Sequence, residues 1–236
     1  MKLLFALIIL TFLLNANNIY PIDGSIKERM IEGGSWHKGC PVPLEDLRYL
    51  TIKYINFAGK EKTGELIVHK SVAKEVSDIF EKLYKIRYPI FKMKLISYYN
   101  ANDKESMRFN NTSAFNCRLM TGSKTKWSKH SYGKAIDINP MQNPYVAKDG
   151  KIVQPVMGRD YIGKNRSHAL SKDSTNQAMI IDGDKILSIF KSYNWKWGGE
   201  WKSLKDYQHF EKIDNTQITP KQLFKSVKVK GSNDLF

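Results

Sequence analysis

Several features are missing from this sequence of 236 residues, and their absence narrows its class. It has no internal repeat, no low-complexity tract and no linker rich in Pro, Gly or Ser, which indicates one domain rather than several. Beyond the N-terminal segment it has no apolar run of the roughly 20 residues that cross a membrane. Its lysines are scattered, without a long basic block or a nucleic-acid-binding motif, so we expect no nucleic-acid partner.

The N-terminal segment has the layout of a secretory signal. Lys2 is followed by Leu3 to Leu14, a run whose only non-apolar member is Thr11, and a small polar stretch comes next. We therefore expect residues 1–17 to be a signal peptide, with an uncleaved anchor as the alternative. Since no cysteine follows the apolar run, a lipoprotein is not expected. The prediction is an exported protein, periplasmic or extracellular at the cell wall, without stable membrane association after cleavage.

Cysteine content and charge add two expectations. Cys40 and Cys117 are the only cysteines, and in an oxidising compartment we expect a disulfide between them that closes a long loop, the alternative being two buried thiols. The formal net charge is +15, which favours anionic partners such as wall polymers, membrane headgroups or nucleic acid without choosing among them.

Hydrophobic periodicity predicts a single small α+β domain over residues 38–213, a short antiparallel sheet with flanking helices, followed by a peripheral tail over 214–236. The expected strands are 50–57 with 65–68 as its hairpin partner, 93–99, 135–139 and 208–213. The expected helices are 71–87, capped by Ser71, and 182–193. Residues 100–127 and 140–175 are expected to be irregular, and residues 195–201 form an aromatic turn.

One group of polar residues surrounds the strand 135–139. In it Ile136 and Ile138 face one way and Asp137 the other, while Gly133 permits a sharp turn between that strand and His130. A loop His and a strand Asp can thus converge on one point, and both suit Zn²⁺. An exposed His beside an ordinary strand Asp is the alternative on this spacing.

A second group is the segment Asp206-Tyr-Gln-His-Phe-Glu211. His209 and Glu211 share one face of a strand, and Asp206 stands close enough to accept a proton from a metal-bound water. The alternative is that Asp206 caps a turn and Glu211 is a solvated strand residue.

Together the two groups resemble a known family. The order Ser-x-His-x-x-Gly-x-Ala-x-Asp, then Trp-Gly-Gly-x-Trp, then Asp-x-x-His-Phe-Glu is similar to the M15 family of zinc peptidases, with its D-Ala-D-Ala carboxypeptidases and L-alanyl-D-glutamate endopeptidases. The resemblance runs from Gly39 to Glu211. It implies a Hedgehog/DD-peptidase-like fold and an exported zinc peptidase that hydrolyses the stem or cross-bridge peptides of peptidoglycan.

Carried over by position, the resemblance assigns a role to each matching residue. His130, Asp137 and His209 would hold one Zn²⁺ per chain and leave a fourth position for water. Asp206 would be the general base, and Arg118 would stabilise the oxyanion or grip a substrate carboxylate, unless it forms only a structural ion pair.

The remaining residues of the matching motifs have weaker roles. Ser128 would bind substrate or shape its turn, and Glu200 competes with Asp206 as the base. Glu211 is expected to orient a ligand His, and the tryptophans of residues 195–201 are expected to pack in the core. His37, His69 and His168 lack a paired motif.

We expect a monomer with peptidoglycan peptides as its partner. The sequence does not choose which bond is cut, a choice that residues 140–175 are expected to make. A zinc-containing peptidoglycan-binding module without turnover is the alternative function, and a secreted polyanion-binding protein is favoured by the charge alone.

Overall fold

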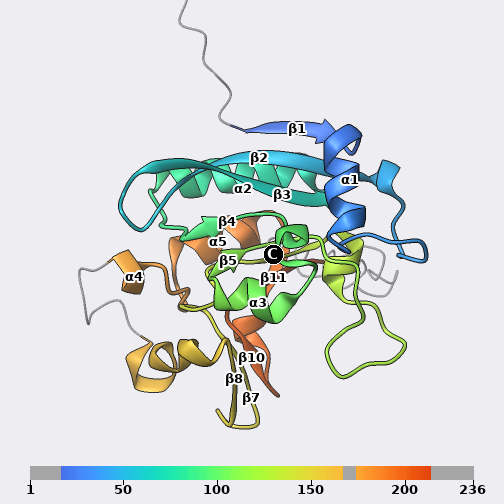
Figure 1. The fold of residues 1–236 in the computed structure, drawn as a ribbon. Coiled ribbons are helices and arrows are strands. Elements are labelled where there is room, and N and C mark those ends of the chain that lie inside the picture. Colours follow the sequence, from blue (N-terminus) through green and yellow to red (C-terminus); the bar gives the residue numbers. More distant parts are fainter. Residues whose placement is uncertain (1–16, 167–173, 214–236) are drawn as a thin grey trace, which may run out of the picture.

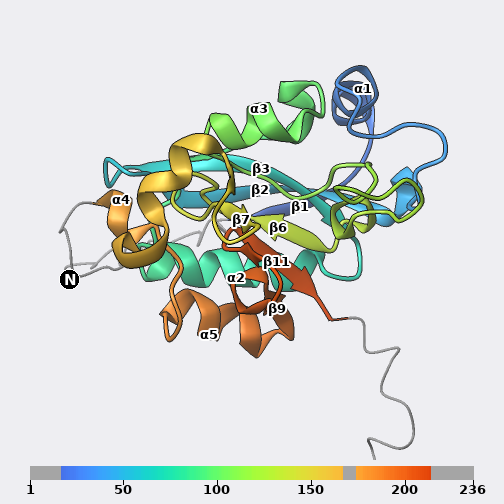
Figure 2. The ribbon, with the colours of Figure 1, turned by 90° about the horizontal axis from the view of Figure 1, so that it is seen from below.

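The structure, a computed structural model, describes residues 17–166 and 174–213. All but the last residue of the expected signal peptide 1–17, and the whole of the expected tail 214–236, lie outside this part of the chain. Small sheets occupy the middle of the molecule, with helices α1 and α3 on one side and α2 and α5 on the other (Figure 2). The mixed α/β character expected from the sequence is therefore confirmed.

The bounds of the elements are as follows. The helices are α1 Gly24–Glu32, α2 Ala73–Lys85, α3 Asp103–Arg108, α4 Ser174–Gln177 and α5 Lys185–Ser192. The strands are β1 Asn18–Pro21, β2 Leu47–Ile55, β3 Glu61–His69, β4 Lys92–Met93, β5 Asn111–Thr112, β6 Ala135–Asp137, β7 Tyr145–Ala147, β8 Ile152–Gln154, β9 Trp195–Trp197, β10 Lys205–Asp206 and β11 His209–Lys212. Short 3-10 helices are η1 Leu44–Asp46, η2 Ile96–Tyr99, η3 Lys129–Tyr132, η4 Val156–Tyr161, η5 Gly163–Asn165 and η7 Gly198–Glu200.

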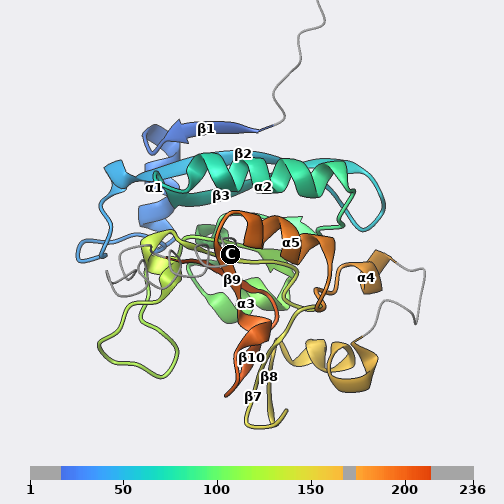
Figure 3. The same cartoon turned by 180° about the vertical axis from the view of Figure 1, so that it is seen from behind.

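The expected hairpin and the helix after it form the largest unit of the fold (Figure 1). β2 and β3 pair antiparallel along their whole length, and β1 adds to the outer edge of β2. Helix α2 covers this sheet from behind (Figure 3). Its apolar side chains recur at helical spacing and are buried, as predicted; they are Val76, Ile79, Phe80 and Leu83, with Val72 just before them.

The start of α2 differs from the prediction. Ser71 is not the cap: the N-cap is Val72, whose side chain makes no capping hydrogen bond, and the helix begins at Ala73. The Ser71 hydroxyl instead lies 2.7 Å from Nδ1 of His69, at the end of β3. A serine hydroxyl can hydrogen-bond to a preceding side chain as well as cap a helix, so the position of Ser71 alone did not fix where the helix begins.

Three other expectations are corrected. The strand expected over 93–99 is only β4, because residues 96–99 form a 3-10 helix. Residues 100–127, expected to be irregular, contain α3 and β5. Residues 195–201 begin with a true strand, β9, rather than an aromatic turn. In each case the segment is short, so local pattern gives a weak signal and tertiary pairing decides.

The long loop expected over 140–175 also contains secondary structure. β7 and β8 form a hairpin, and β10 pairs with β7 to complete a three-stranded sheet in the order β10-β7-β8. A second three-stranded sheet has the order β6-β11-β9. These two small sheets carry the polar groups singled out from the sequence.

The elements before residue 38, where the sequence placed the start of the domain, pack onto the same body. Met30 of α1 is fully buried in an apolar cluster with Leu47 and Phe115. Among the described residues, none of the helices combines the length and the apolar character that crossing a membrane requires.

Candidate active site

Two of the expected metal ligands face each other across neighbouring strands. β6 and β11 are antiparallel, and His209 lies directly opposite Asp137. Opposite residues point to the same face of a sheet, and Nδ1 of His209 lies 3.0 Å from Oδ1 of Asp137. On the other face, Ile136 and Phe210 are buried in the main core. The alternation read from the sequence is thus what directs both polar side chains away from that core.

The third expected ligand, His130, comes from the 3-10 helix η3. The hydroxyl of Ser128, its N-cap, accepts the backbone N–H of His130 at 3.3 Å. The turn closes at Gly133, which has a φ of 63°, and a Cβ there would lie 2.5 Å from the backbone nitrogen of His69. Only glycine combines that conformation with so close an approach to β3.

The ring of His130 is oriented by the backbone. Its Nδ1 lies 2.6 Å from the carbonyl oxygen of Ala114, so Nδ1 donates and Nε2 is left as the lone-pair nitrogen. Nε2 in turn lies 3.2 Å from Oδ2 of Asp137 and 3.3 Å from Nδ1 of His209. Glu211 is placed equally well to orient the other ring, because its Oε2 lies 3.4 Å from Nε2 of His209.

These three side chains fit a zinc ion. Their ligand atoms lie 3.0–3.3 Å apart, and the edge of a tetrahedron with metal bonds of about 2.0–2.1 Å is about 3.3 Å. His130 and His209 are almost fully buried, and the carboxylate is the only negative member of the triad. Two imidazoles and a carboxylate with a fourth position open are the ligand set of a catalytic rather than a structural zinc.

The electrostatics of the triad also favour a bound cation. Burial on its own raises the pKa of Asp137, but the two histidines outweigh it and hold that pKa well below its usual range. Burial lowers the pKa of His209, but its hydrogen bonds to Asp137 and Glu211 dominate and raise it to about 10. The site therefore favours positive charge beside the Asp137 carboxylate, which a divalent cation supplies more strongly than a proton.

Asp206, the expected general base, lies beside this cluster on β10. Its Oδ1 is buried and makes no hydrogen bond to any described residue. Burial, and then the charge of Asp137, raise the pKa of Asp206 to about 6. A buried carboxyl group that has one oxygen without a hydrogen-bond partner and lies beside these three side chains is suited to exchanging a proton near neutral pH.

Gly198 explains how Asp206 comes so close to the cluster. A Cβ on Gly198 would lie 2.6 Å from the carbonyl oxygen of Asp206, 3.0 Å from its Cβ and 3.3 Å from the Cβ of His209. The bare backbone of the Trp-Gly-Gly motif is therefore the surface against which the base and a metal ligand pack. Next to it, the half-buried ring of Trp201 lies 5.4 Å from that of His209.

Arg118 lies on the segment that runs alongside η3. Its carbonyl oxygen accepts the N–H of Ser128 at 3.1 Å and the hydroxyl of Ser131 at 2.6 Å. Its guanidinium forms an ion pair with Asp103 of α3. The structure thus places Arg118 and Ser128 against the His130 turn, where the visible role of Ser128 is to shape that turn. Their contacts with substrate stay predictions.

The competing base is placed differently. Glu200 is exposed and its carboxylate lies 2.6 Å from the ammonium group of Lys191. Trp195 and Trp197 are buried in the main core, as expected, but Trp201 is only half-buried and is not part of that core. Glu200 therefore has a surface partner that Asp206 lacks.

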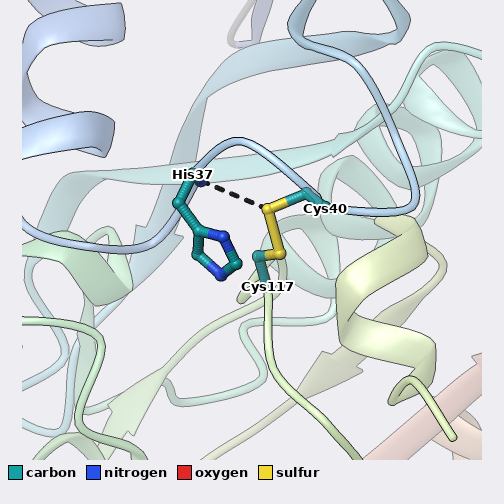
Figure 4. Close-up of side chains that lie close together, drawn as sticks. All are labelled: His37, Cys40 and Cys117. Atoms are coloured by element: carbon teal, nitrogen blue, oxygen red, sulfur yellow. Dashed lines mark hydrogen bonds between the residues drawn. A yellow bond between two sulfur atoms is a disulfide. The ribbon is translucent and has the colours of Figure 1, made fainter. Parts of the chain in front are cut away.

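The two cysteines meet away from the metal cluster. Cys40 and Cys117 form a disulfide that spans 77 positions of sequence, and the backbone N–H of His37 donates to Sγ of Cys40 (Figure 4). Because both sulfurs are in this bond, the three side chains do not form a second metal site. Nδ1 of His69 lies 2.7 Å from the hydroxyl of Ser71, and His168 lies outside the described residues.

Three contributors to the site were not identified from the sequence. Asp103 pairs with Arg118, and the carbonyl of Ala114 orients His130. Gly198 was noted only as part of a motif. Asn102 caps α3 by accepting the N–H of Glu105, and this Asn-x-x-Glu signal could have revealed the helix that carries Asp103. The role of the Ala114 carbonyl could not be read from the sequence, because every residue has a backbone carbonyl.

Comparison with known proteins finds a matching family and, among the curated proteins, a matching endopeptidase. A family described as D-alanyl-D-alanine carboxypeptidase matches residues 121–212. The peptidoglycan L-alanyl-D-glutamate endopeptidase CwlK of Bacillus subtilis (strain 168) is 34% identical over 88 residues. That alignment covers 37% of this chain and 41% of the relative, so the chain spans less than half of the relative's length.

The matched segment is shorter than the resemblance seen in the sequence, which ran from residue 39. It contains His130, Asp137, Asp206 and His209, and it leaves out Arg118. No solved structure matches the chain.

Proposed function

We propose that this chain is a zinc-dependent peptidase of the M15 family that acts on peptidoglycan peptides, because residues 121–212 match the D-alanyl-D-alanine carboxypeptidase family and 88 residues are 34% identical to an endopeptidase. The observation that carries the proposal is the convergence of His130, Asp137 and His209, whose ligand atoms lie within 3.3 Å of one another, beside the Asp206 carboxyl, whose Oδ1 has no hydrogen-bond partner. The activity is of the D-Ala-D-Ala carboxypeptidase or the L-Ala-D-Glu endopeptidase type, and the fold is Hedgehog/DD-peptidase-like.

Each residue of the cluster has a defined task in this proposal. His130 Nε2, His209 Nδ1 and the Asp137 carboxylate would hold the zinc ion, which would acidify water and polarise the substrate carbonyl. Asp206 accepts the proton of the attacking water and gives it to the leaving amine, so the same carboxyl serves as base and then as acid. Arg118 supplies positive charge near the cleaved carbonyl when its pairing with Asp103 loosens.

We further propose that the protein acts outside the cytoplasm as a monomer, with residues 1–17 as the signal that exports it. Two features support this: peptidoglycan lies outside the membrane, and a disulfide such as Cys40–Cys117 persists in oxidising compartments. Cell fractionation tests export, and recovery of the protein mainly from the cytosol would contradict it.

The activity is tested on purified peptidoglycan with and without a chelator. We expect soluble muropeptides with new termini, loss of their release on chelation, and its return when zinc is added. Mass spectrometry of the products identifies the bond. Undiminished binding to peptidoglycan without any new terminus, in the zinc-loaded protein, would show a binding module instead.

A further inference from the structure

The sheet β10-β7-β8 places three polar side chains in one row. Asp206 lies directly opposite Tyr145, and Tyr145 lies directly opposite Gln154. Residues that face each other across antiparallel strands project from the same face of the sheet. A carboxyl, a phenol and a carboxamide thus follow one another from β10 to β8, at the strand spacing of about 4.8 Å.

The row lies on a partly accessible face of this sheet. Its cross-strand neighbours Lys205, Val146 and Val153 point the opposite way, and Val153 is 3% exposed. Tyr145 and Gln154 themselves are half-buried, so part of each side chain is accessible. The row therefore begins at the proposed base and continues along a surface that a substrate can reach.

The chemistry of the row suits a peptide backbone. A phenol and a carboxamide can each donate and accept a hydrogen bond, as a peptide group can. By strand alternation, the other residues of these strands on the same face are Ala147 and Ile152. A substrate that ends one residue beyond the cleaved bond, as for a carboxypeptidase, would end before Gln154, which lies two strand spacings of about 4.8 Å each from Asp206.

Asp206 also fixes the direction of the substrate. In the proposed mechanism it returns the proton to the leaving amine, so the row starts on the leaving-group side. We propose that Tyr145 and Gln154 bind the peptide that continues beyond the cleaved bond, and hence that this chain is an endopeptidase rather than a carboxypeptidase. This inference rests on the proposed function and assigns its substrate class.

The experiment compares stem peptides of different length in the zinc-loaded protein. The probes are the dipeptide L-Ala-D-Glu, the stem tetrapeptide that extends it, and the pentapeptide ending in D-Ala-D-Ala. We expect kcat/KM for the L-Ala-D-Glu bond to be at least about tenfold higher in the tetrapeptide, since one or two additional hydrogen bonds are made. Release of the terminal D-Ala should be slower than that cleavage.

The variant Tyr145→Phe/Gln154→Ala should lose most of the length advantage, that is, the higher kcat/KM of the tetrapeptide over the dipeptide. The loss should come from a higher KM, with kcat within about threefold of the original. By calorimetry its Kd for the product tripeptide should be weaker by about tenfold. The control is Tyr20→Phe on β1, an exposed tyrosine of the sheet β1-β2-β3, which should change neither quantity.

Equal cleavage of dipeptide and tetrapeptide, or terminal D-Ala release as the main activity, would overturn the inference. So would an unchanged length advantage in a double variant that folds and binds zinc normally. If the unsubstituted protein cleaves none of the peptides, the proposed function fails. The product Kd then decides separately whether the row binds peptide.

Discussion

Replacing Asp206 by asparagine should lower activity and raise the stability of the zinc-free protein at neutral pH. The substitution keeps the shape of the side chain and removes its charge. Turnover should fall by about 10²–10⁴, the usual contribution of a general base. Stability should rise because the native state buries the Asp206 oxygen Oδ1 without a hydrogen-bond partner.

The size of the gain follows from the pKa of Asp206, which burial and the charge of Asp137 raise from 3.8 to about 6. A raised pKa means that the native state binds the proton more tightly than the unfolded chain. The stability that the native state gains from this tighter proton binding is fully present below about pH 4 and is lost as pH rises through 6. At pH 7.5 the ionised carboxyl thus costs up to about 3 kcal/mol, at about 1.4 kcal/mol per pKa unit.

The assay is urea denaturation of chelated protein at pH 4 and pH 7.5. The stability difference between Asp206→Asn and the original should be more favourable to the variant by about 1–3 kcal/mol at the higher pH. Glu200→Gln is the control: its exposed ion pair with Lys191 is worth about 0–1 kcal/mol, so stability should change little and turnover should stay within roughly tenfold.

Three results would refute the reasoning. If the stability difference is the same at both pH values, Asp206 is not held at an energetic cost and its raised pKa is wrong. If Asp206→Asn hydrolyses muropeptides at the original rate while Glu200→Gln with zinc bound does not, the base is Glu200. If both variants remain active, the proposed mechanism fails.

Three further outcomes are expected. Metal analysis of the purified protein should give about one zinc per chain, and His209→Ala should lower that stoichiometry; a value still near one would place the metal elsewhere. Thiol titration under denaturing, non-reducing conditions should find Cys40 and Cys117 unreactive in exported protein, and two reactive thiols would exclude the disulfide. Gly198→Ala should lose about 1–3 kcal/mol of stability and about a hundredfold in turnover, because its Cβ would push Asp206 and the metal ligand apart. Gly64→Ala, which meets the side chain of Met93 instead, should lose stability only, and equal activity loss in both variants would argue against a local effect.

The parts of the molecule that could be predicted from the sequence are those with a regular pattern of adequate length. The β2–β3 hairpin and helix α2 each have nine or more residues, so their periodicity is unambiguous. β6 has only three residues, yet two buried isoleucines around Asp137 sufficed to set its faces. The direction of the metal-facing side chains therefore follows from local alternation.

The rest depends on pairing between distant segments. β7, β8, β9 and β10 have two or three residues each, too few for a local pattern, and they exist because partners elsewhere in the chain complete their hydrogen bonds. The ion pair of Asp103 with Arg118 likewise joins a helix that the sequence reading missed to a segment beside η3.

The same contrast between local sequence pattern and pairing of distant segments applies to the proposed site. Metal ligation requires a fixed set of side chains, so His130, Asp137 and His209 stand in motifs that can be recognised in one sequence. Substrate selection requires only that suitable hydrogen-bonding groups lie beside the proposed base. The register of strand pairing places them there: Tyr145 faces Asp206 because β7 pairs with β10 at that position. A shift of that pairing by one residue would turn Tyr145 to the opposite face. On the proposal made above, specificity depends on how the hairpin of residues 145–154 is aligned against β10. The sequence led us to expect that residues 140–175 decide which bond is cut, but it could not show this alignment, because the pairing joins distant segments.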